Sequence, residues 1–159
     1  MNFTNLLLGF DGRISRQQFW IGFAVLTVVE LGVRLALGVP LFPQSMKPFP
    51  VRLTEAGIEL VTLYPTAAVL IKRLHDRDQP GIYVAWVIGI SLVVLVADLI
   101  GVTGDPNNTT WLDWILAFFA IGIGLAFLIE LGFRRGTDGE NRYGPDPLGG
   151  PALGDRERT

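Results

Sequence analysis

The chain has 159 residues, of which 50% are hydrophobic and 18% are charged, with a formal net charge of −2. Soluble domains of this length rarely combine so much apolar sequence with so little charge, so the composition indicates a membrane protein. The lack of a basic excess argues against nucleic-acid binding. With one histidine and no cysteine, the chain has no thiol nucleophile, disulfide or cysteine-based zinc site, and we expect no metal and no cofactor.

Four apolar stretches approach the roughly 20 residues that a helix needs to cross a bilayer. The predicted helices span residues 19–39, 54–74, 82–102 and 111–133. The second is the weakest prediction, because its apolar part is short and contains Glu59 and Pro65, although a spanning helix tolerates proline when its neighbours satisfy the freed carbonyl. The predicted fold is therefore all-α, a four-transmembrane-helix bundle. Residues 1–148 form one membrane domain and residues 149–159 a flexible tail.

Capping residues mark the ends of these helices. Ser15 followed by Gln18 is typical of a capping box at the start of the first helix, and Thr110 with Asp113 repeats the pattern before the fourth. Glycines suited to left-handed C-terminal turns follow the first, third and fourth helices at Gly38, Gly104 and Gly136. Four prolines within residues 40–53 predict an extended loop between the first two helices.

The basic residues are distributed unequally between the two sides of this topology. Ten lie on the side that carries both termini, whereas Lys47 and Arg52 are the two on the other side and Arg34 lies within the first helix. Because cytoplasmic loops are enriched in lysine and arginine, the bias predicts a multi-pass protein with both termini in the cytoplasm.

Three polar stretches fall on the predicted cytoplasmic side. They read FDGRISRQQFW over residues 10–20, KRLHDRDQPG over residues 72–81, and RRGTDGENRYGPDP over residues 134–147. Together they resemble the bacterial inner-membrane family called domain of unknown function 805, whose pattern runs roughly F-x-G-R-x-x-R-x-x-F-W, R-R-L-H-D and G-T-x-G-x-N-x-Y-G-x-D-P. The resemblance covers about residues 10–148. It implies a four-helix protein of the bacterial inner (plasma) membrane and supplies no established activity.

The same stretches could converge into one cytoplasmic polar layer with the arginines to bind an anion such as a lipid headgroup or a phosphate. Its candidate residues are Arg13, Arg16, Arg73, His75, Asp76, Asn141, Arg142, Tyr143 and Asp146. In the alternative interpretation, these residues satisfy the positive-inside rule and hold the loops together through arginine–aspartate pairs. Adjacent residues such as His75 and Asp76 point in different directions and do not orient each other, so we predict no catalytic residue.

A second polar group lies inside the predicted membrane spans, at Glu30, Arg34, Glu59 and Asp98. One charge at mid-bilayer costs roughly 3 kcal/mol or more, so such residues usually face each other or a wet cavity. We therefore expect Arg34 to pair with at least one of the three carboxylates, which could serve a proton or cation site. Alternatively, the helices sit shallower and these charges reach the outer headgroups.

Three functional hypotheses follow. The leading one is a non-enzymatic protein that binds an anionic headgroup or phosphate at its cytoplasmic face. The alternatives are a small proton- or cation-coupled carrier or channel that uses the membrane carboxylates, and a structural subunit whose tail recruits a partner. Small residues spaced four apart on the fourth helix favour close packing within the bundle over a dimer seam, although a homo-oligomer is left open. These pairs are Ala120 with Gly124 and Gly122 with Ala126.

Overall fold

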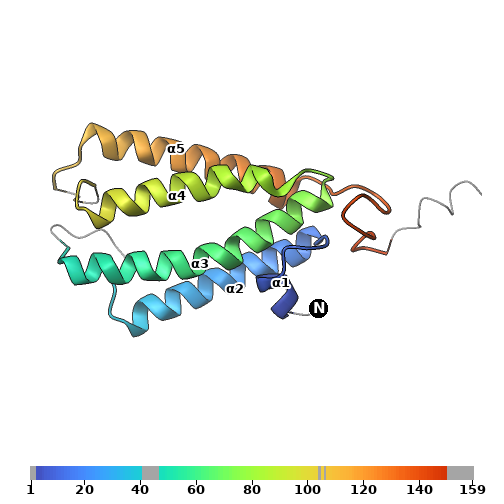
Figure 1. Cartoon of the computed structure of the whole chain (residues 1–159), viewed down its shortest axis with the longest axis horizontal. Helices are drawn as coiled ribbons and strands as arrows, with labels where there is room; N and C mark the ends of the chain where they lie inside the picture. Colours follow the sequence, from blue (N-terminus) through green and yellow to red (C-terminus); the bar gives the residue numbers. More distant parts are fainter. Residues whose placement is uncertain (1–2, 41–46, 104, 106, 150–159) are drawn as a thin grey trace, which may run out of the picture.

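The computed structural model describes residues 3–40, 47–103, 105 and 107–149. Within them the chain forms an all-α bundle of four membrane-spanning helices, preceded by one short helix (Figure 1). The elements are α1 (Phe3–Leu8), α2 (Arg16–Ala36), α3 (Phe49–Asp76), the 3-10 turn η1 (Gly81–Tyr83), α4 (Val84–Leu99), α5 (Trp111–Phe127) and the π-helical turn η2 (Leu128–Phe133).

Both predicted capping boxes are confirmed. At the start of α2 the Gln18 N–H donates to Ser15 Oγ at 3.3 Å, and the Ser15 N–H donates to Gln18 Oε1 at 2.9 Å. At the start of α5 the Thr110 N–H donates to Asp113 Oδ2 at 2.7 Å, and the Thr110 hydroxyl accepts from the Asp113 N–H. These bonds satisfy backbone donors that a helix N-terminus otherwise leaves free, which is why α2 begins three residues before the apolar stretch.

The prediction was less accurate at the other helix boundaries. α3 begins at Phe49, so the predicted loop over residues 40–53 is wrong for its last five residues, since Pro50 fits the first turn of a helix. Residues 41–46 and Gly104 lie outside the described residues. Gly38 ends α2 at a φ of +66°, as expected, while Gly101, at +77°, follows the end of α4 earlier than the predicted residue 102. The prediction for Gly136 is wrong, because its φ is not positive.

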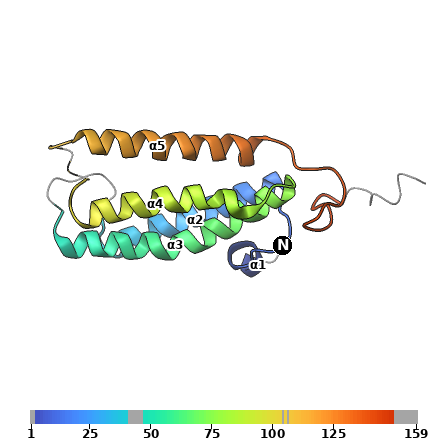
Figure 2. The same ribbon diagram turned by 45° about the horizontal axis from the view of Figure 1, so that its top comes forward.

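The bundle consists of two helical hairpins, α2–α3 and α4–α5, that meet at one end. There the Trp20 Nε1–H donates to the Gly132 carbonyl at 3.1 Å, which joins α2 to η2. Buried apolar residues fill the same end, among them Phe19, Leu74 and Leu131. Figures 1 and 2 show α1 and the segment after η2 at this end, which we call the Arg73 end. The opposite end, where Arg52 of α3 donates to the Asp98 carbonyl of α4 at 3.4 Å, is the Asp98 end.

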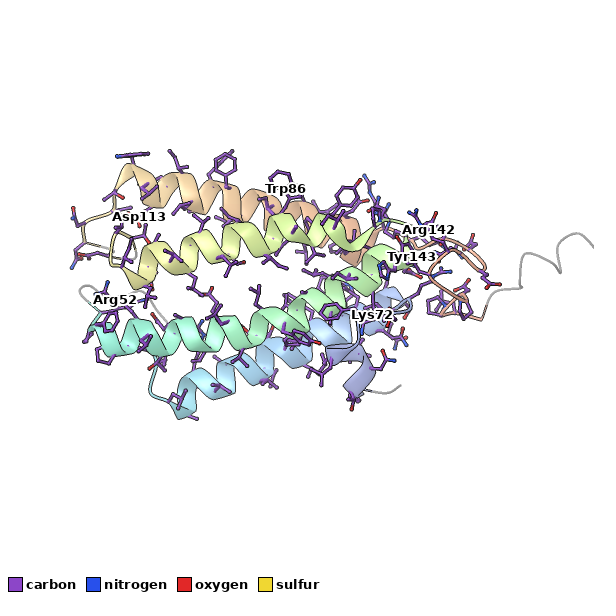
Figure 3. All side chains as sticks on the ribbon, viewed as in Figure 1. Arg52, Lys72, Trp86, Asp113, Arg142 and Tyr143 are labelled. Carbon is purple, nitrogen blue, oxygen red and sulfur yellow. The ribbon has the colours of Figure 1, made fainter. Side chains whose placement is uncertain are left out.

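The outer surface of the bundle is strongly apolar, as contact with lipid requires. Trp86, Trp111, Trp114 and Phe118 are each at least 70% exposed, and Figure 3 shows Trp86 on the outside of the bundle. The interpretation of the small residues on the fourth helix is wrong. A Cβ at Gly122 or Gly124 would meet open space, so neither glycine serves close packing within the bundle.

Candidate functional site

The centre of the Arg73 end is a buried ion cluster, formed by Arg13, Arg73 and Asp76. Arg13 comes from the loop before α2, whereas Arg73 and Asp76 occupy the last turn of α3, where their i,i+3 spacing puts them on one face. Arg13 Nη2 lies 3.0 Å from Asp76 Oδ1, and Arg73 Nη1 donates to Asp76 Oδ2. The exposed fraction of the side chain is 1% for Arg13, 0% for Arg73 and 4% for Asp76. One carboxylate thus pairs with two buried guanidinium groups, so the three side chains together keep one positive charge.

All the donors of Arg13 are used inside the protein. Besides Asp76, Nη1 donates to the carbonyls of Gly139 and Gly144 at 2.6 and 3.2 Å, and Nη2 donates to the Thr137 carbonyl at 2.7 Å. Arg13 therefore fastens the segment after η2 to the end of α3. An anion could reach its donors only by displacing these acceptors.

The donors of Arg73 are also bonded to acceptors inside the protein. Its Nε donates to the Leu131 carbonyl at 2.7 Å, and Nη2 donates to the Arg134 carbonyl at 2.6 Å. These carbonyls lie in and just after the π-helical turn, where the regular i→i−4 bonding of α5 is broken. Gly136 passes so close to Asp76 that a Cβ there would overlap the carboxylate. This close approach, and not a left-handed turn, accounts for glycine at that position.

His75 lies beside the buried ion cluster but does not join it. Its ring stacks on Tyr143, with centroids 3.8 Å apart and planes at 5°, and Nδ1 lies 3.3 Å from the Gly12 carbonyl. The Asn141 amide donates to the His75 carbonyl at 2.9 Å. Through these contacts His75 packs the loop before α2 and the segment after η2 against the end of α3.

The remaining candidates at this end lie nearer the surface. Arg142 pairs with Asp78, its Nε 3.0 Å from Oδ1, and Arg16 donates to the Phe133 carbonyl at 3.3 Å. Asp146 accepts N–H bonds from Leu148 and Gly139 at 2.8 and 3.0 Å. These two bonds hold the pKa of the Asp146 carboxyl below its ordinary range.

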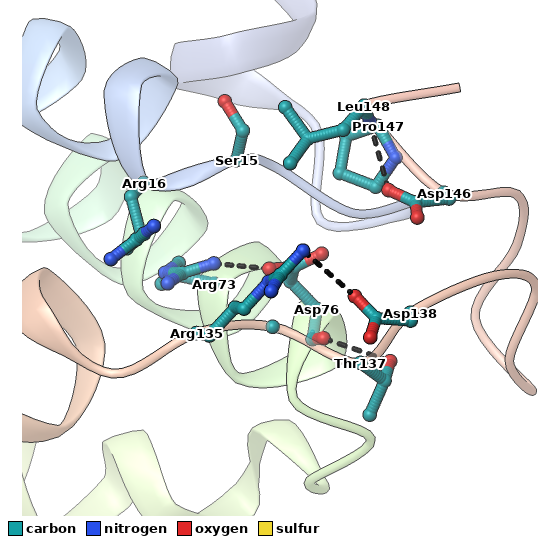
Figure 4. Close-up of a pocket in the computed structure, with 11 residues that line it drawn as sticks. Ser15, Arg16, Arg73, Asp76, Arg135, Thr137, Asp138, Asp146, Pro147 and Leu148 are labelled. Carbon is teal, nitrogen blue, oxygen red and sulfur yellow. Dashed lines mark hydrogen bonds and ion pairs between the residues drawn. The ribbon is translucent and has the colours of Figure 1, made fainter. Parts of the chain in front are cut away.

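A small space between these groups is lined by Arg16, Arg73, Asp76, Arg135 and Thr137, among others (Figure 4). Its volume is about 30 Å³, which is enough for ordered water but not for a phosphate group.

The Asp98 end contains a much larger space, which we call the charged cavity. It has a volume of about 310 Å³ and opens between the two hairpins. Its walls come from all four long helices and the segment before α3. The charged residues in its lining are Arg34, Lys47, Glu55, Glu59, Asp98 and Asp113. Figure 3 shows Arg52 and Asp113 at this end, on opposite hairpins.

Ion pairs neutralise only part of this charge. Arg34 Nε lies 2.9 Å from Glu30 Oε1, which confirms the predicted pairing of Arg34 with a membrane carboxylate. Lys47 Nζ lies 2.9 Å from Glu55 Oε2 and 3.9 Å from Asp98 Oδ2. In the lining that the structure describes, four carboxylates therefore face two basic groups, one of which is already paired with Glu30.

The carboxylates are spread around the walls of the charged cavity. Over the described residues, no three histidine or acidic side chains come close enough together to hold a metal ion. The geometry therefore suits a hydrated or organic cation better than a transition metal, which requires several converging ligands.

Comparison with known proteins identifies the family. The family described as "Protein of unknown function (DUF805)" matches residues 7–145. The chain belongs to this family. Uncharacterized protein YiiR of Escherichia coli K12 is 33% identical over 147 residues, which cover 92% of this chain and 90% of YiiR. Inner membrane protein YhaI of the same organism is 28% identical, over 88% of this chain and 86% of YhaI. Inner membrane protein YhaH is 29% identical, over 88% of this chain and 88% of YhaH. No solved structure matches the chain.

The three family motifs meet at the Arg73 end, where loop 10–15, the end of α3 and residues 134–147 contact each other through Arg13 and Arg73. Of the intramembrane candidates, Arg34, Glu59 and Asp98 line one cavity, and Glu30 joins it through Arg34. Sequence reasoning missed Glu55, Lys47 and Asp113 as members of this group. Glu55 could have been found, because it precedes Glu59 by four residues and shares its helix face.

Proposed function

We propose that this inner-membrane protein binds a small cation within the bilayer, in the charged cavity, and that the Asp98 end faces the periplasm. The observation that carries the proposal is a cavity of about 310 Å³ with more carboxylates than basic groups in its described lining. In a low-dielectric surrounding, excess negative charge attracts cations and raises their local concentration.

The size and lining of the charged cavity support a ligand site. Pockets for small molecules typically begin near 300 Å³ and combine apolar walls with a few polar groups. Here Leu95, Leu116, Ala117 and Ala120 supply the apolar wall beside the carboxylates. The cavity is therefore large enough for a hydrated metal cation or a small ammonium compound.

The proposed orientation rests on the charge distribution. Ten basic residues lie at the Arg73 end or in the tail, against Lys47 and Arg52 at the Asp98 end. By the positive-inside rule the Arg73 end and both termini are cytoplasmic, and the charged cavity opens to the periplasm. The names of YhaI and YhaH as inner membrane proteins support the choice of membrane.

An anion site at the Arg73 end has less support. Arg13 and Arg73 donate to protein acceptors, and the space of about 30 Å³ beside Arg73 is too small for phosphate. A second space of about 250 Å³ borders Arg13 and Lys72, but Lys72 Nζ also donates to backbone carbonyls, those of Asn5 and Leu6. These contacts favour the alternative interpretation, in which the cytoplasmic arginines hold the loops together.

Charge-selective thiol labelling tests the proposal, because the chain contains no cysteine. In Ala117→Cys the new thiol lies in the cavity wall and every native charge is kept. A cationic methanethiosulfonate added from the periplasmic side should label it at least about tenfold faster than an anionic reagent of similar size. Asn108→Cys, at an exposed position in the loop before α5, is the control and should react with both at similar rates.

Removing a negative charge from the charged cavity should weaken the preference for the cationic reagent. In the Ala117→Cys background, Asp98→Asn should bring the two labelling rates closer together, while Asp138→Asn, an exposed position at the Arg73 end, should not. Equal rates for both reagents at Ala117→Cys, with all carboxylates present, would contradict a cation-selective cavity.

A further inference from the structure

A second cavity lies next to the charged cavity, on the side of the Arg73 end. It lies between α3 and α4 and has a volume of about 140 Å³. Its polar lining consists of Glu59, Thr62, Thr66 and Ser91, and we call it the hydroxyl cavity. The two cavities share Glu59 and Leu95 in their linings, so they are neighbours and Glu59 lies at their border.

The two threonine hydroxyls in this lining can act toward a ligand only as acceptors, through their oxygen lone pairs. The Thr62 hydroxyl donates to the Glu59 carbonyl at 3.2 Å, and the Thr66 hydroxyl donates to the Thr62 carbonyl at 2.8 Å. Each hydroxyl has one proton, so both proton positions are used by the backbone of α3 and the free lone pairs remain for another partner. Thr62 and Thr66 therefore present oxygen acceptors on the same helix face as Glu59.

Glu59 supplies the charge. Its carboxylate makes no hydrogen bond or close ion pair with any residue that the structure describes, although Arg34 lines the same charged cavity. A carboxylate and several hydroxyl oxygens around a small space are the ligand type that hard cations prefer. With a single carboxylate, the set balances one positive charge.

The hydroxyl cavity ends toward the Arg73 end. Beyond Thr66 on α3 come the buried residues Ala67, Val69 and Leu74, which pack in one apolar core with Val84 of α4. An ion that passed Glu59 from the charged cavity into the hydroxyl cavity would therefore meet an apolar layer on the side of the Arg73 end.

We propose that the hydroxyl cavity is a binding site for a single alkali-metal cation, held by the Glu59 carboxylate and the oxygens of Thr62, Thr66 and Ser91. This inference rests on the proposed function, since the ion reaches the site through the charged cavity. The wide, charged cavity attracts the cation, and the cation then loses hydration water in the narrow, hydroxyl-lined cavity.

The test is equilibrium binding of radioactive sodium and rubidium ions to the purified full-length protein in detergent. One of these ions should bind at about one per chain, and Glu59→Gln should abolish the binding. Thr66→Val removes one oxygen at constant shape and should raise the Kd at least about tenfold. Thr27→Val is its matched control, because the Thr27 hydroxyl also donates to the carbonyl four residues earlier, at 2.9 Å, but lines neither cavity.

The outcomes separate this inference from the proposed function. If Thr66→Val and Ser91→Ala bind as the wild type does while Asp98→Asn does not, the cation sits in the charged cavity, and the hydroxyl site is wrong. If the wild type binds neither ion but Ala117→Cys still reacts selectively with the cationic thiol reagent, the inference is again wrong and the cation-selective cavity stands. Loss of binding in Thr27→Val as well as Thr66→Val would also overturn it, since the effect would then not depend on the cavity.

Discussion

The buried ion cluster makes Asp76→Asn the most informative stability variant. Asp76 is the one carboxylate that contacts both Arg13 and Arg73 in the described part of the chain. Asparagine has nearly the same shape but no charge, so the variant leaves two guanidinium groups, each no more than 1% exposed, without a counter-charge. The perturbation is therefore electrostatic and not steric.

Its magnitude follows from the burial of the pairs. Removing one partner of a buried ion pair typically costs about 3–5 kcal/mol, and here two cations lose the same partner. The carbonyl acceptors of Arg13 and Arg73 remain and offset part of the loss. We expect the free energy of unfolding to fall by about 4 kcal/mol, toward the middle of that range.

Reversible unfolding in mixed micelles, followed by tryptophan fluorescence, measures this change. Asp138→Asn is the matched control, because the Asp138–Arg135 pair has side chains that are 62% and 72% exposed. Exposed pairs contribute at most about 1 kcal/mol, so the control should unfold almost as the wild type does. A loss below about 1 kcal/mol in Asp76→Asn would refute the view that this cluster holds the Arg73 end together.

Three further predictions concern the same end of the bundle. Gly136→Ala should lower the melting temperature, because its Cβ would overlap the Asp76 carboxylate, whereas Gly124→Ala, which has open space, should leave it unchanged or raise it. Because the folded-state pKa of Asp146 is lowered, its stabilising contribution is present above the ordinary aspartate range and is lost as the pH falls through the lowered value. Asp146→Asn should remove that acid dependence in a pH series of unfolding measurements. Lys72→Met should loosen α1, because Lys72 Nζ donates to the Leu6 carbonyl at 2.6 Å, and faster hydrogen exchange over residues 3–8 would show it.

The sequence predicted features that depend on local chemistry. The helix starts at Ser15 and Thr110 follow from capping residues a few positions apart, and the spans follow from apolar length. The Glu30–Arg34 pair follows from i,i+4 spacing. In each case the interacting groups are near neighbours in the chain, so no tertiary information is needed.

The sequence did not show which donors the fold already uses. It placed Arg13 and Arg73 in one polar layer, but their acceptors are largely backbone carbonyls at Thr137, Gly139 and Leu131. Every residue carries such a carbonyl, so no pattern of side chains reveals which carbonyls accept from Arg13 and Arg73. The charged cavity likewise has walls from all four long helices, so no local sequence pattern predicts it.

The most direct test of the cation-binding account is a structure of the protein determined with thallium, a heavy monovalent cation that replaces alkali ions. The account predicts a strong peak inside the membrane region, in contact with the carboxylate of Glu59. Peaks confined to surface carboxylates such as Asp138, with none in either cavity, would contradict it.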